Sequence, residues 1–256
     1  MILFKYGGHA ISDSQGIDPV LALLSKEISA GKKIIIVHGG GPAINKELEI
    51  HGVKSEMVGG LRKTTPEILE VVQRTLCGEV QRKLVNQLIA LGVNAVGLTA
   101  GDGNLTRAKI SKPELGLVGE VVSVNPDYLI SQIDIGITPV ISPISITPNG
   151  QAVNMNADII AGAIGGALKA ESVLFSTDVS GIYRNWPDKN SLIQSINVEE
   201  LTQISQTFEG GMIPKAESAI NAIKSGAKKV QIFDGRDIFN IELALKGEGG
   251  TLVLSQ

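Results

Sequence analysis

The sequence predicts an α/β fold, a three-layer αβα sandwich in which helices cover both faces of a central, mainly parallel sheet. Three observations support this fold class. Short apolar runs alternate with longer segments of helical periodicity along the 256 residues. Most of the short runs are continuously apolar, which is typical of parallel strands that are buried on both faces. Several helical segments open with proline in the first turn and end at glycine.

The expected elements follow from these patterns. We place strands at residues 2–6, 33–37, 95–99, 138–142, 172–176, 229–233 and 251–254. Helical periodicity predicts helices at 19–30, 42–51, 66–91, 126–133, 157–170, 198–206, 214–225 and 238–246. Residues 106–124 and 144–153 are typical of hairpins, and residues 53–63 are expected to be extended. Because the hairpins stop near residue 170 and a second α/β half begins there, we expect lobes of residues 1–170 and 171–256.

The composition limits the partners of the chain. The net charge is −3, the sequence pI is about 5.7, and no basic stripe is visible, so nucleic acid is not an expected partner. Cys77 is the only cysteine, and a lone thiol is typical of the reducing cytoplasm. We find no signal peptide and no apolar run of about 20 residues. These features predict a cytoplasmic protein without a membrane segment.

Two lysines lie beside glycine-rich turns at opposite ends of the chain. Lys5 ends the first expected strand and is followed by Gly7-Gly8. Lys215 follows Gly210-Gly211 at a helix start, where a cation opposes the helix dipole unless an anion is bound. Glycine turns expose backbone N–H groups to anions, and lysines add movable positive charge. Together these motifs indicate phosphoryl transfer, although Lys5 and its glycines alone are better explained as an ordinary surface turn.

A third glycine run, Gly39–Gly41, follows an apolar strand. Three consecutive glycines cost more entropy than a tight turn requires, so they indicate the close approach of a ligand. The spacing G-G-G-P does not match the G-x-G-x-x-G turn of dinucleotide-binding oxidoreductases, which disfavours that class. We interpret His38 as a packing or hydrogen-bonding residue. Arg62 could bind a carboxylate in bidentate fashion, although considered alone it is better explained as a solvated arginine.

Two more polar segments are candidates. Asn156 can cap the helix that follows it, and Asp158 then lies in the first turn, where the dipole favours its charge. Helix capping explains the presence of one of the polar residues Asn154, Asn156 and Asp158, and the other two need another explanation. Residues 176–182 follow an expected strand, and ligands of open α/β sheets gather beyond the carboxyl ends of strands. This segment is a candidate nucleotide contact, and a polar surface loop explains it equally well.

In this order, the motifs resemble the amino acid kinase superfamily. They are the segments 5–8, 39–41, 60–62, 154–158, 177–181 and 210–215, and the resemblance covers nearly the whole chain. Within the superfamily the chain is most similar to the branch that phosphorylates N-acetylglutamate. The resemblance implies transfer of the γ-phosphoryl group of ATP to the side-chain carboxylate of N-acetyl-L-glutamate, the second step of arginine biosynthesis. It also implies that Mg²⁺ arrives on the ATP phosphates, without metal ligands from the protein.

The resemblance further implies roles for individual residues. Lys5 and Lys215 would neutralise the transferring phosphoryl group, and Asp158 would hold both lysines. The amino-acid substrate would contact the N-terminal lobe at Gly40, Gly41, Arg62 and Asn154. ATP would bind mainly to the C-terminal lobe, and the nucleotide side would comprise Gly8, Asp178, Val179, Ser180, Gly181, Ile182, Tyr183, Thr207, Phe208, Glu209 and Met212. A carboxylate acceptor is already ionised at neutral pH, so the reaction needs no general base and can rest on positioning and charge.

Two alternatives remain open. A kinase for carrier-protein-linked aminoadipate, in lysine biosynthesis, would need a basic groove for its acidic carrier, and residues 62–65 offer little of one. A noncatalytic nucleotide-sensing module could share the fold, but it would not need both lysines and Asp158.

The resemblance also implies a homodimer, because the family forms dimers through the helix that corresponds to residues 66–91. A helix of that extent would be about 39 Å long, more than one small lobe usually covers. Its apolar residues recur at helical spacing, namely Ile68, Leu69, Val72, Leu76 and Val80. Arginine-inhibited members carry an extra N-terminal helix, whereas Lys5 is the fifth residue here, so we expect no inhibition by arginine.

Overall fold

The computed structural model describes residues 1–7 and 16–255. Within these residues, eight strands form one sheet in the order β12-β14-β13-β11-β1-β2-β8-β5. Neighbouring strands are parallel except β13 and β14. The bounds are β1 Ile2–Tyr6, β2 Ile34–His38, β5 Ala95–Thr99, β8 Thr138–Ser142, β11 Ser172–Thr177, β12 Ser195–Asn197, β13 Lys229–Asp234 and β14 Thr251–Leu254. The predicted mainly parallel sheet is therefore confirmed.

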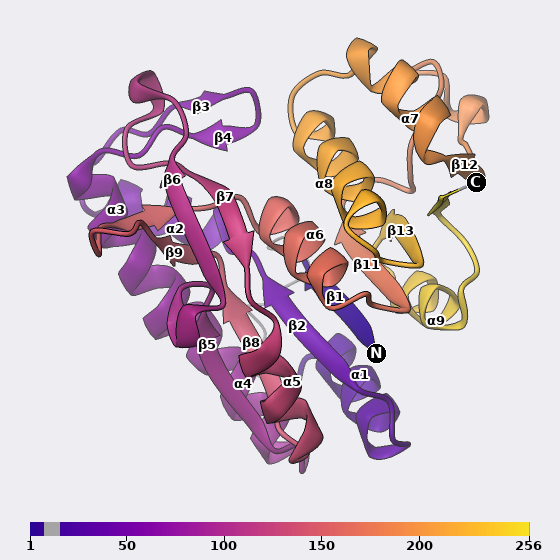
Figure 1. Cartoon of the computed structure of the whole chain (residues 1–256), viewed down its shortest axis with the longest axis horizontal. Coiled ribbons are helices and arrows are strands. Elements are labelled where there is room, and N and C mark those ends of the chain that lie inside the picture. The colour runs from indigo at the N-terminus through magenta and orange to yellow at the C-terminus, as the bar shows by residue number, and fades with distance from the viewer. Residues whose placement is uncertain (8–15, 256) are drawn as a thin grey trace.

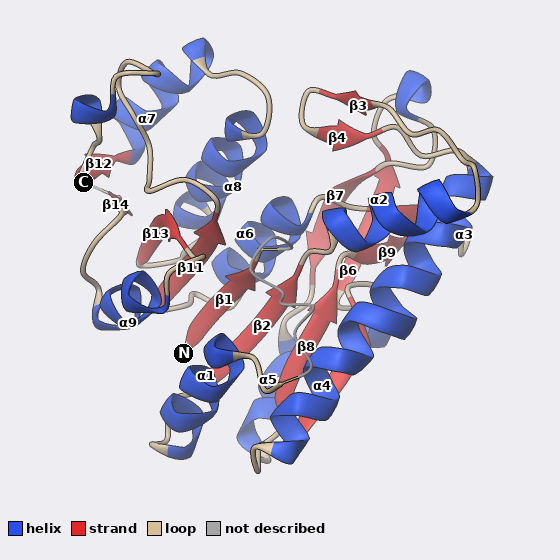
Figure 2. Cartoon of the chain, turned by 180° about the vertical axis from the view of Figure 1, so that it is seen from behind, coloured by secondary structure: helices blue, strands red, loops and turns tan. Residues whose placement is uncertain are grey.

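Helices cover both faces of this sheet (Figure 1). The apolar residues of α5, α6, α7 and α8 pack against one face, and those of α1, α4 and α9 pack against the other (Figure 2). The helices are α1 Pro19–Ser29, α2 Gly41–Ile50, α3 Pro66–Gln73, α4 Gln81–Ala90, α5 Asp127–Asp134, α6 Ala157–Ala167, α7 Val198–Ile204, α8 Met212–Lys224 and α9 Ile238–Lys246. This is the three-layer sandwich that the sequence predicts.

The long helix expected at residues 66–91 is present but is not uniform. A π-helical turn, Arg74–Val80, joins α3 to α4. All members of the apolar stripe are buried in the chain's own core, namely Ile68, Leu69, Val72, Leu76 and Val80. The chain's own core therefore accounts for the whole stripe, which leaves none of its apolar side chains exposed for a partner.

Three hairpins stand apart from the main sheet. They pair β6 Thr106–Ile110 with β7 Gly119–Val124, β9 Ile144–Ile146 with β10 Ala152–Asn154, and β3 Met57–Val58 with β4 Leu61–Arg62. The first two confirm the predicted hairpins. The third corrects the expectation of a merely extended segment: Gly59 and Gly60 have φ of +56° and +80° and form its two-residue turn. Figures 1 and 2 show β3 and β4 beyond the carboxyl end of the sheet.

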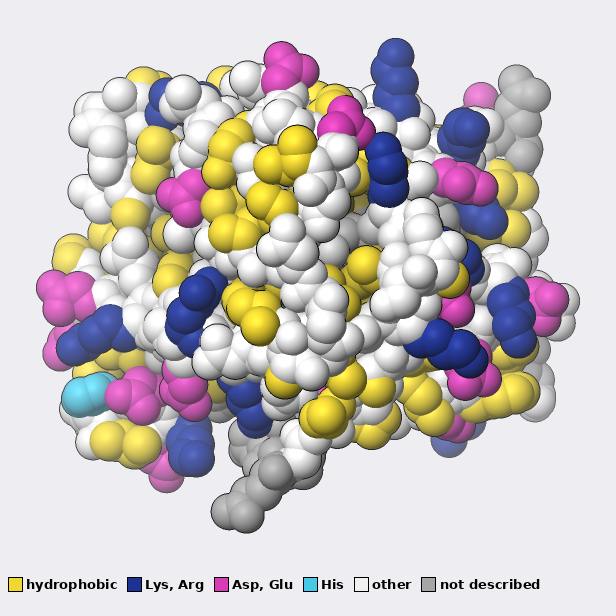
Figure 3. Space-filling view, turned by 90° about the horizontal axis from the view of Figure 1, so that it is seen from below, with side chains coloured by type: hydrophobic (Ala, Val, Ile, Leu, Met, Phe, Trp, Pro, Cys, Tyr) yellow, Lys and Arg dark blue, Asp and Glu magenta, His cyan; other side chains and the backbone are white. Residues whose placement is uncertain are grey.

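The molecular surface carries charges of both signs. Figure 3 shows Lys and Arg side chains mixed with Asp and Glu on the face seen from below, opposite the β3–β4 hairpin. Within the described residues, no helix combines the length and the apolar character that crossing a membrane requires.

Candidate active site

The two lysines that the sequence singles out meet at one carboxylate. The Nζ atom of Lys5 lies 2.9 Å from Oδ1 of Asp158, and the Nζ atom of Lys215 lies 3.2 Å from Oδ2. Lys5 and Lys215 are 210 positions apart in the sequence, so only the tertiary fold brings them together. The arrangement that the resemblance implied for Asp158 is the one observed in this structure.

The fold explains why these three side chains converge. Lys5 lies near the carboxyl end of β1, on the strand face that also carries Leu3 and packs against α6. Asp158 lies in the first turn of α6, which Asn156 caps by accepting hydrogen bonds from the N–H groups of Asp158 and Ile159 at 2.8 and 3.2 Å. Lys215 lies in the first turn of α8, which packs along α6. Two helix N-termini and one strand end therefore meet at the cluster.

Electrostatics keeps the cluster charged. The carboxylate of Asp158 is 6% exposed, and the Lys5 side chain is 9% exposed. Burial alone would raise the pKa of Asp158, but the charges and hydrogen bonds of Lys5 and Lys215 hold it below its ordinary value. The cluster thus carries one negative and two positive charges, and its surplus positive charge suits an anionic ligand.

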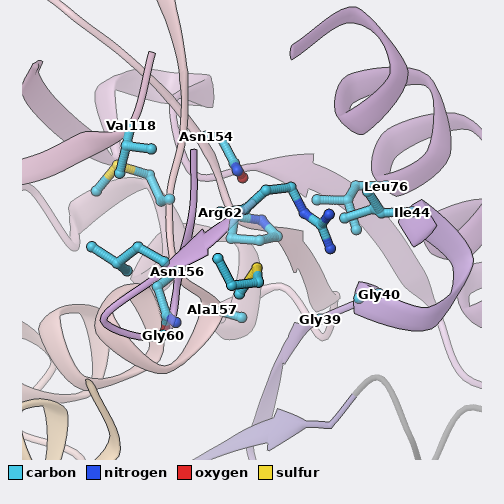
Figure 4. A pocket seen from close by; sticks show the side chains of 15 residues that line it. Gly39, Gly40, Ile44, Gly60, Arg62, Leu76, Val118, Asn154, Asn156 and Ala157 are labelled. Atoms are coloured by element: carbon cyan, nitrogen blue, oxygen red, sulfur yellow. The ribbon is translucent and has the colours of Figure 1, made fainter. Parts of the chain in front are cut away.

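A cavity of about 150 Å³ opens between the Gly39–Gly41 turn, the β3–β4 hairpin and the start of α6 (Figure 4). Its wall contains all four residues expected to bind the amino-acid substrate, namely Gly40, Gly41, Arg62 and Asn154. Asn156 and Ala157 also line the wall, so the cavity reaches the residue before Asp158. Most of the remaining lining is apolar, including Ile44, Leu76, Val118, Pro143 and Met155.

Arg62 is held in place by two neutral side chains. Its Nη1 atom donates to Oγ of Ser55 at 2.6 Å, and its Nη2 atom donates to Oδ1 of Asn45 at 2.6 Å. Figure 4 shows the guanidinium extending from β4 toward Ile44 and Leu76. Burial lowers the pKa of Arg62 from its ordinary value, but a guanidinium stays protonated in proteins. Because each Nη atom carries two protons, one on each remains available for a carboxylate.

Asn154 is joined to the same wall through Thr64. The Nδ2 atom of Asn154 donates to Oγ1 of Thr64 at 3.1 Å, and that hydroxyl donates to the carbonyl oxygen of Arg62 at 2.6 Å. Thr64 is fully buried. The buried hydroxyl of Thr64 therefore fixes Asn154 relative to the backbone of Arg62.

The glycines of the two turns differ in how closely the protein packs around them. A Cβ atom at Gly40 would lie 2.6 Å from Cδ2 of Leu76, whereas one at Gly41 would meet nothing within 4 Å. A Cβ atom at Gly7 would lie 2.7 Å from the carbonyl oxygen of Ser176 and 3.8 Å from Nζ of Lys5. Gly8, which we expected to contact phosphate, lies outside the described residues.

His38 has no charge to contribute near neutral pH. Complete burial lowers its pKa to about 4, and its Nδ1 atom donates to the carbonyl oxygen of Gly39 at 2.9 Å. This agrees with its interpretation as a hydrogen-bonding residue.

The expected nucleotide side lies at the carboxyl ends of β11 and β13. Asp178 and Ser180 are exposed, and Val179 and Tyr183 are half-buried. The side chain of Ile182 is instead fully buried in the core. A Cβ atom at Gly181 would lie 2.4 Å from Oγ1 of Thr251, so these two residues anchor the loop against β14.

The second expected nucleotide segment precedes α8. Thr207 and Glu209 are exposed, while Phe208 and Met212 are half-buried and pack against the core. The segment runs directly into the helix that carries Lys215, so it is placed beside the charged cluster.

Sequence reasoning missed several residues at this edge. Asn45 and Ser55 orient Arg62, and their only signal is their proximity to the glycine turn and to the hairpin. Gly235 packs on Ser176, and its N–H donates to the carbonyl oxygen of Thr177 at 2.9 Å. Such contacts join segments far apart in the chain, so no local pattern indicates them.

Comparisons with known proteins agree with this geometry. The model of the amino acid kinase family matches residues 1–234, and the chain belongs to this family. It is similar to the acetylglutamate kinase of Corynebacterium urealyticum, with 38% identity over 265 residues, 100% of this chain and 87% of that protein. The acetylglutamate kinase of Mycolicibacterium gilvum is 40% identical over 243 residues, 92% of this chain and 84% of that protein. The crystal structure of smu.665 from Streptococcus mutans UA159 has a TM-score of 0.83 at 28% identity, covering 100% of this chain and 98% of that chain.

Proposed function

We propose that this protein transfers the γ-phosphoryl group of ATP to the side-chain carboxylate of N-acetyl-L-glutamate, in arginine biosynthesis. The observation that carries the proposal is a cavity with Arg62 in its wall, whose lining extends to Ala157, the residue before the Asp158 that pairs with Lys5 and Lys215. Similarity to acetylglutamate kinases over the full chain supports it.

The cavity offers a contact for each part of the acid. Arg62 would bind the α-carboxylate through its two remaining Nη protons. Asn154 and the amides of the Gly40–Gly41 turn would bind the acetylamino group, and the apolar wall near Ile44 and Leu76 would accept the methyl group. The side-chain carboxylate then points toward Asp158 and its lysines.

Phosphoryl transfer needs no proton from the protein. An oxygen of the acid carboxylate forms a bond to the γ-phosphorus, while the bond from that phosphorus to the β–γ bridging oxygen breaks and ADP takes the electron pair. Lys5 and Lys215 would neutralise charge on the oxygens around the phosphorus. Asp158 is a positioning residue because it contacts both lysines but, in this proposal, not the reacting atoms.

ATP would enter as its magnesium complex. Within residues 1–7 and 16–255, no group of three His, Cys, Asp or Glu side chains is placed to hold a metal ion, and each oxygen of Asp158 faces a lysine. Because both oxygens of Asp158 already face lysines, Mg²⁺ would be carried on the nucleotide phosphates. The nucleotide would bind to the lobe of residues 171–256, through the loop after β11 and the segment before α8, and the acid to the lobe of residues 1–170.

We also propose that the protein is a homodimer that works in the cytoplasm. The family resemblance supports the dimer, with the outward face of the α3–α4 run as its interface. That face is hollowed between Glu70, Gln73, Arg74, Cys77 and Gly78. A reducing compartment would keep Cys77 as a thiol.

The test of the function is detection of the acyl phosphate. Hydroxylamine traps an acyl phosphate as a hydroxamate, so purified protein with MgATP should yield hydroxamate from N-acetylglutamate. Glutamate, aspartate and an N-acylated aminoadipate are the comparison substrates. A higher yield of hydroxamate from the aminoadipate derivative would favour the alternative function, a kinase of lysine biosynthesis. If no acid yields ATP-dependent hydroxamate, the result would favour a noncatalytic module.

A further inference from the structure

The turn of the β3–β4 hairpin lies directly against the segment that begins α8. A Cβ atom at Gly60 would lie 3.0 Å from the carbonyl oxygen of Gly210 and 3.2 Å from both Cγ and Cδ of Pro214. Because the nearest atom belongs to the backbone, a side chain at residue 60 would force one of the two segments to move. A side chain at residue 60 would therefore displace the hairpin from the start of α8 by a few tenths of an ångström.

The two sides of this contact belong to different parts of the site. Gly60 and Arg62 both line the acid cavity. Across the contact, Pro214 directly precedes Lys215, whose Nζ atom is bound to Asp158. The carbonyl oxygen of Gly210 also accepts a hydrogen bond from the N–H of Ile213 at 3.3 Å, so it is part of the first turn of α8. The hairpin that carries Arg62 thus rests on the helix start that carries Lys215.

We propose that this contact couples the binding of the two substrates, an inference that rests on the function proposed above. When the hairpin is seated on α8, Arg62 is placed for the acid, and Lys215 is placed for the phosphates of the nucleotide. A ligand shifts a conformational equilibrium only when it binds one state better than the other. Both ligands bind the seated state better, because each uses a cation that this contact positions. Each substrate therefore raises the affinity for the other by the same factor.

The hairpin turn supplies its own control. Gly59 and Gly60 both have positive φ, so alanine is strained at either position. A Cβ atom at Gly59, however, would meet nothing within 4 Å. The difference between Gly60→Ala and Gly59→Ala therefore isolates the contact with α8 from strain in the turn. Pro214→Ala removes the ring from the other side of the contact and leaves the turn unaltered.

Titration calorimetry tests the coupling. The dissociation constant of N-acetylglutamate is measured alone and with a saturating, nonhydrolysable magnesium–ATP analogue. In the wild type and in Gly59→Ala, we expect the nucleotide to lower this constant at least about fivefold, the lower end of typical coupling. In Gly60→Ala and Pro214→Ala the ratio should fall to about one, while the acid alone still binds. Circular dichroism checks folding, and if Gly60→Ala does not fold, Pro214→Ala decides the outcome.

Several outcomes would overturn the inference. A wild type that makes acyl phosphate but shows no coupling contradicts the inference and leaves the proposed function intact. Equal loss of coupling in Gly59→Ala and Gly60→Ala assigns the effect to turn strain. Full coupling in Pro214→Ala shows that the contact is not the link. A wild type that makes no acyl phosphate from N-acetylglutamate overturns the proposed function, and the coupling with it.

Discussion

Replacing Asp158 by asparagine should destabilise the fold as well as impair the reaction. The substitution keeps the size of the side chain but leaves two lysines, 9% and 16% exposed, without a counter-charge. Removing one partner from a buried ion pair costs about 3–5 kcal/mol. The asparagine oxygen can still accept a hydrogen bond from one lysine, so we expect a loss near the lower end, about 3 kcal/mol. At about 2–4 °C per kcal/mol for a chain of this size, the unfolding midpoint should fall by about 6–12 °C.

The matched control is a surface carboxylate with the same geometry. Lys33 and Asp134 also lie 2.9 Å apart, but both side chains are more than half exposed. Asp134→Asn should therefore change the unfolding free energy by no more than about 1 kcal/mol. Urea unfolding followed by circular dichroism measures both variants. Equal stability of Asp158→Asn and Asp134→Asn would refute the reasoning, because it would show that the cluster is solvated.

The pH dependence of this difference follows from the pKa of Asp158. The lysines hold that pKa below its ordinary value, so the stabilisation is complete above the unfolded-state pKa of about 3.9. It is lost as the pH falls through the lower, folded-state pKa. The difference in stability between the wild type and Asp158→Asn should be constant from neutral pH to about pH 4 and should narrow below it.

Three further predictions concern activity and assembly. Lys5→Ala and Lys215→Ala should each lower kcat about 30- to 1,000-fold, equivalent to about 2–4 kcal/mol, with little change in KM for N-acetylglutamate. Steady-state kinetics measures both constants, and an unchanged kcat would exclude the role assigned to the lysine. Arg62→Ala should raise KM for N-acetylglutamate and leave KM for ATP near the wild-type value. Asn45→Ala should raise KM for N-acetylglutamate by a smaller factor. An equal rise in KM for ATP would place Arg62 on the nucleotide side. Light scattering should give the mass of a dimer, and a stable monomer would contradict the proposed assembly.

The sequence predicts most of the sheet well because the signal of each long strand is local. Most long strands are continuous apolar runs, such as Ile34–Val37 within β2, and their length distinguishes them from helices. Lys5 and Lys215 are conspicuous because they lie next to glycine turns. Their meeting at Asp158 follows from the family resemblance and not from any spacing in the chain.

The elements that the sequence does not predict depend on tertiary contacts. β12 has three residues, of which only Ile196 is fully buried, so no apolar run indicates it. The β3 and β4 strands have two residues each, exposed in β3 and half-buried in β4, and the position of Gly60 beside Pro214 is set by packing. Asn45 and Ser55 bind the side chain of Arg62 from 17 and 7 positions away in the sequence. At these separations, residue type alone does not predict which side chains are in contact.

The order of the strands places the segments expected to bind the acid and the nucleotide on either side of β1. β1 lies between β2 and β11, and the chain leaves β1 toward β2 and returns to its other side with β11. Such a reversal of strand order opens a crevice at the carboxyl ends of the strands. The glycine turn of the acid cavity follows β2, and the expected nucleotide loop follows β11. These two strands are about 10 Å apart, two strand spacings, and Lys5 lies on the strand between them. In the proposed reaction the phosphoryl group would therefore pass above β1, within reach of Lys5.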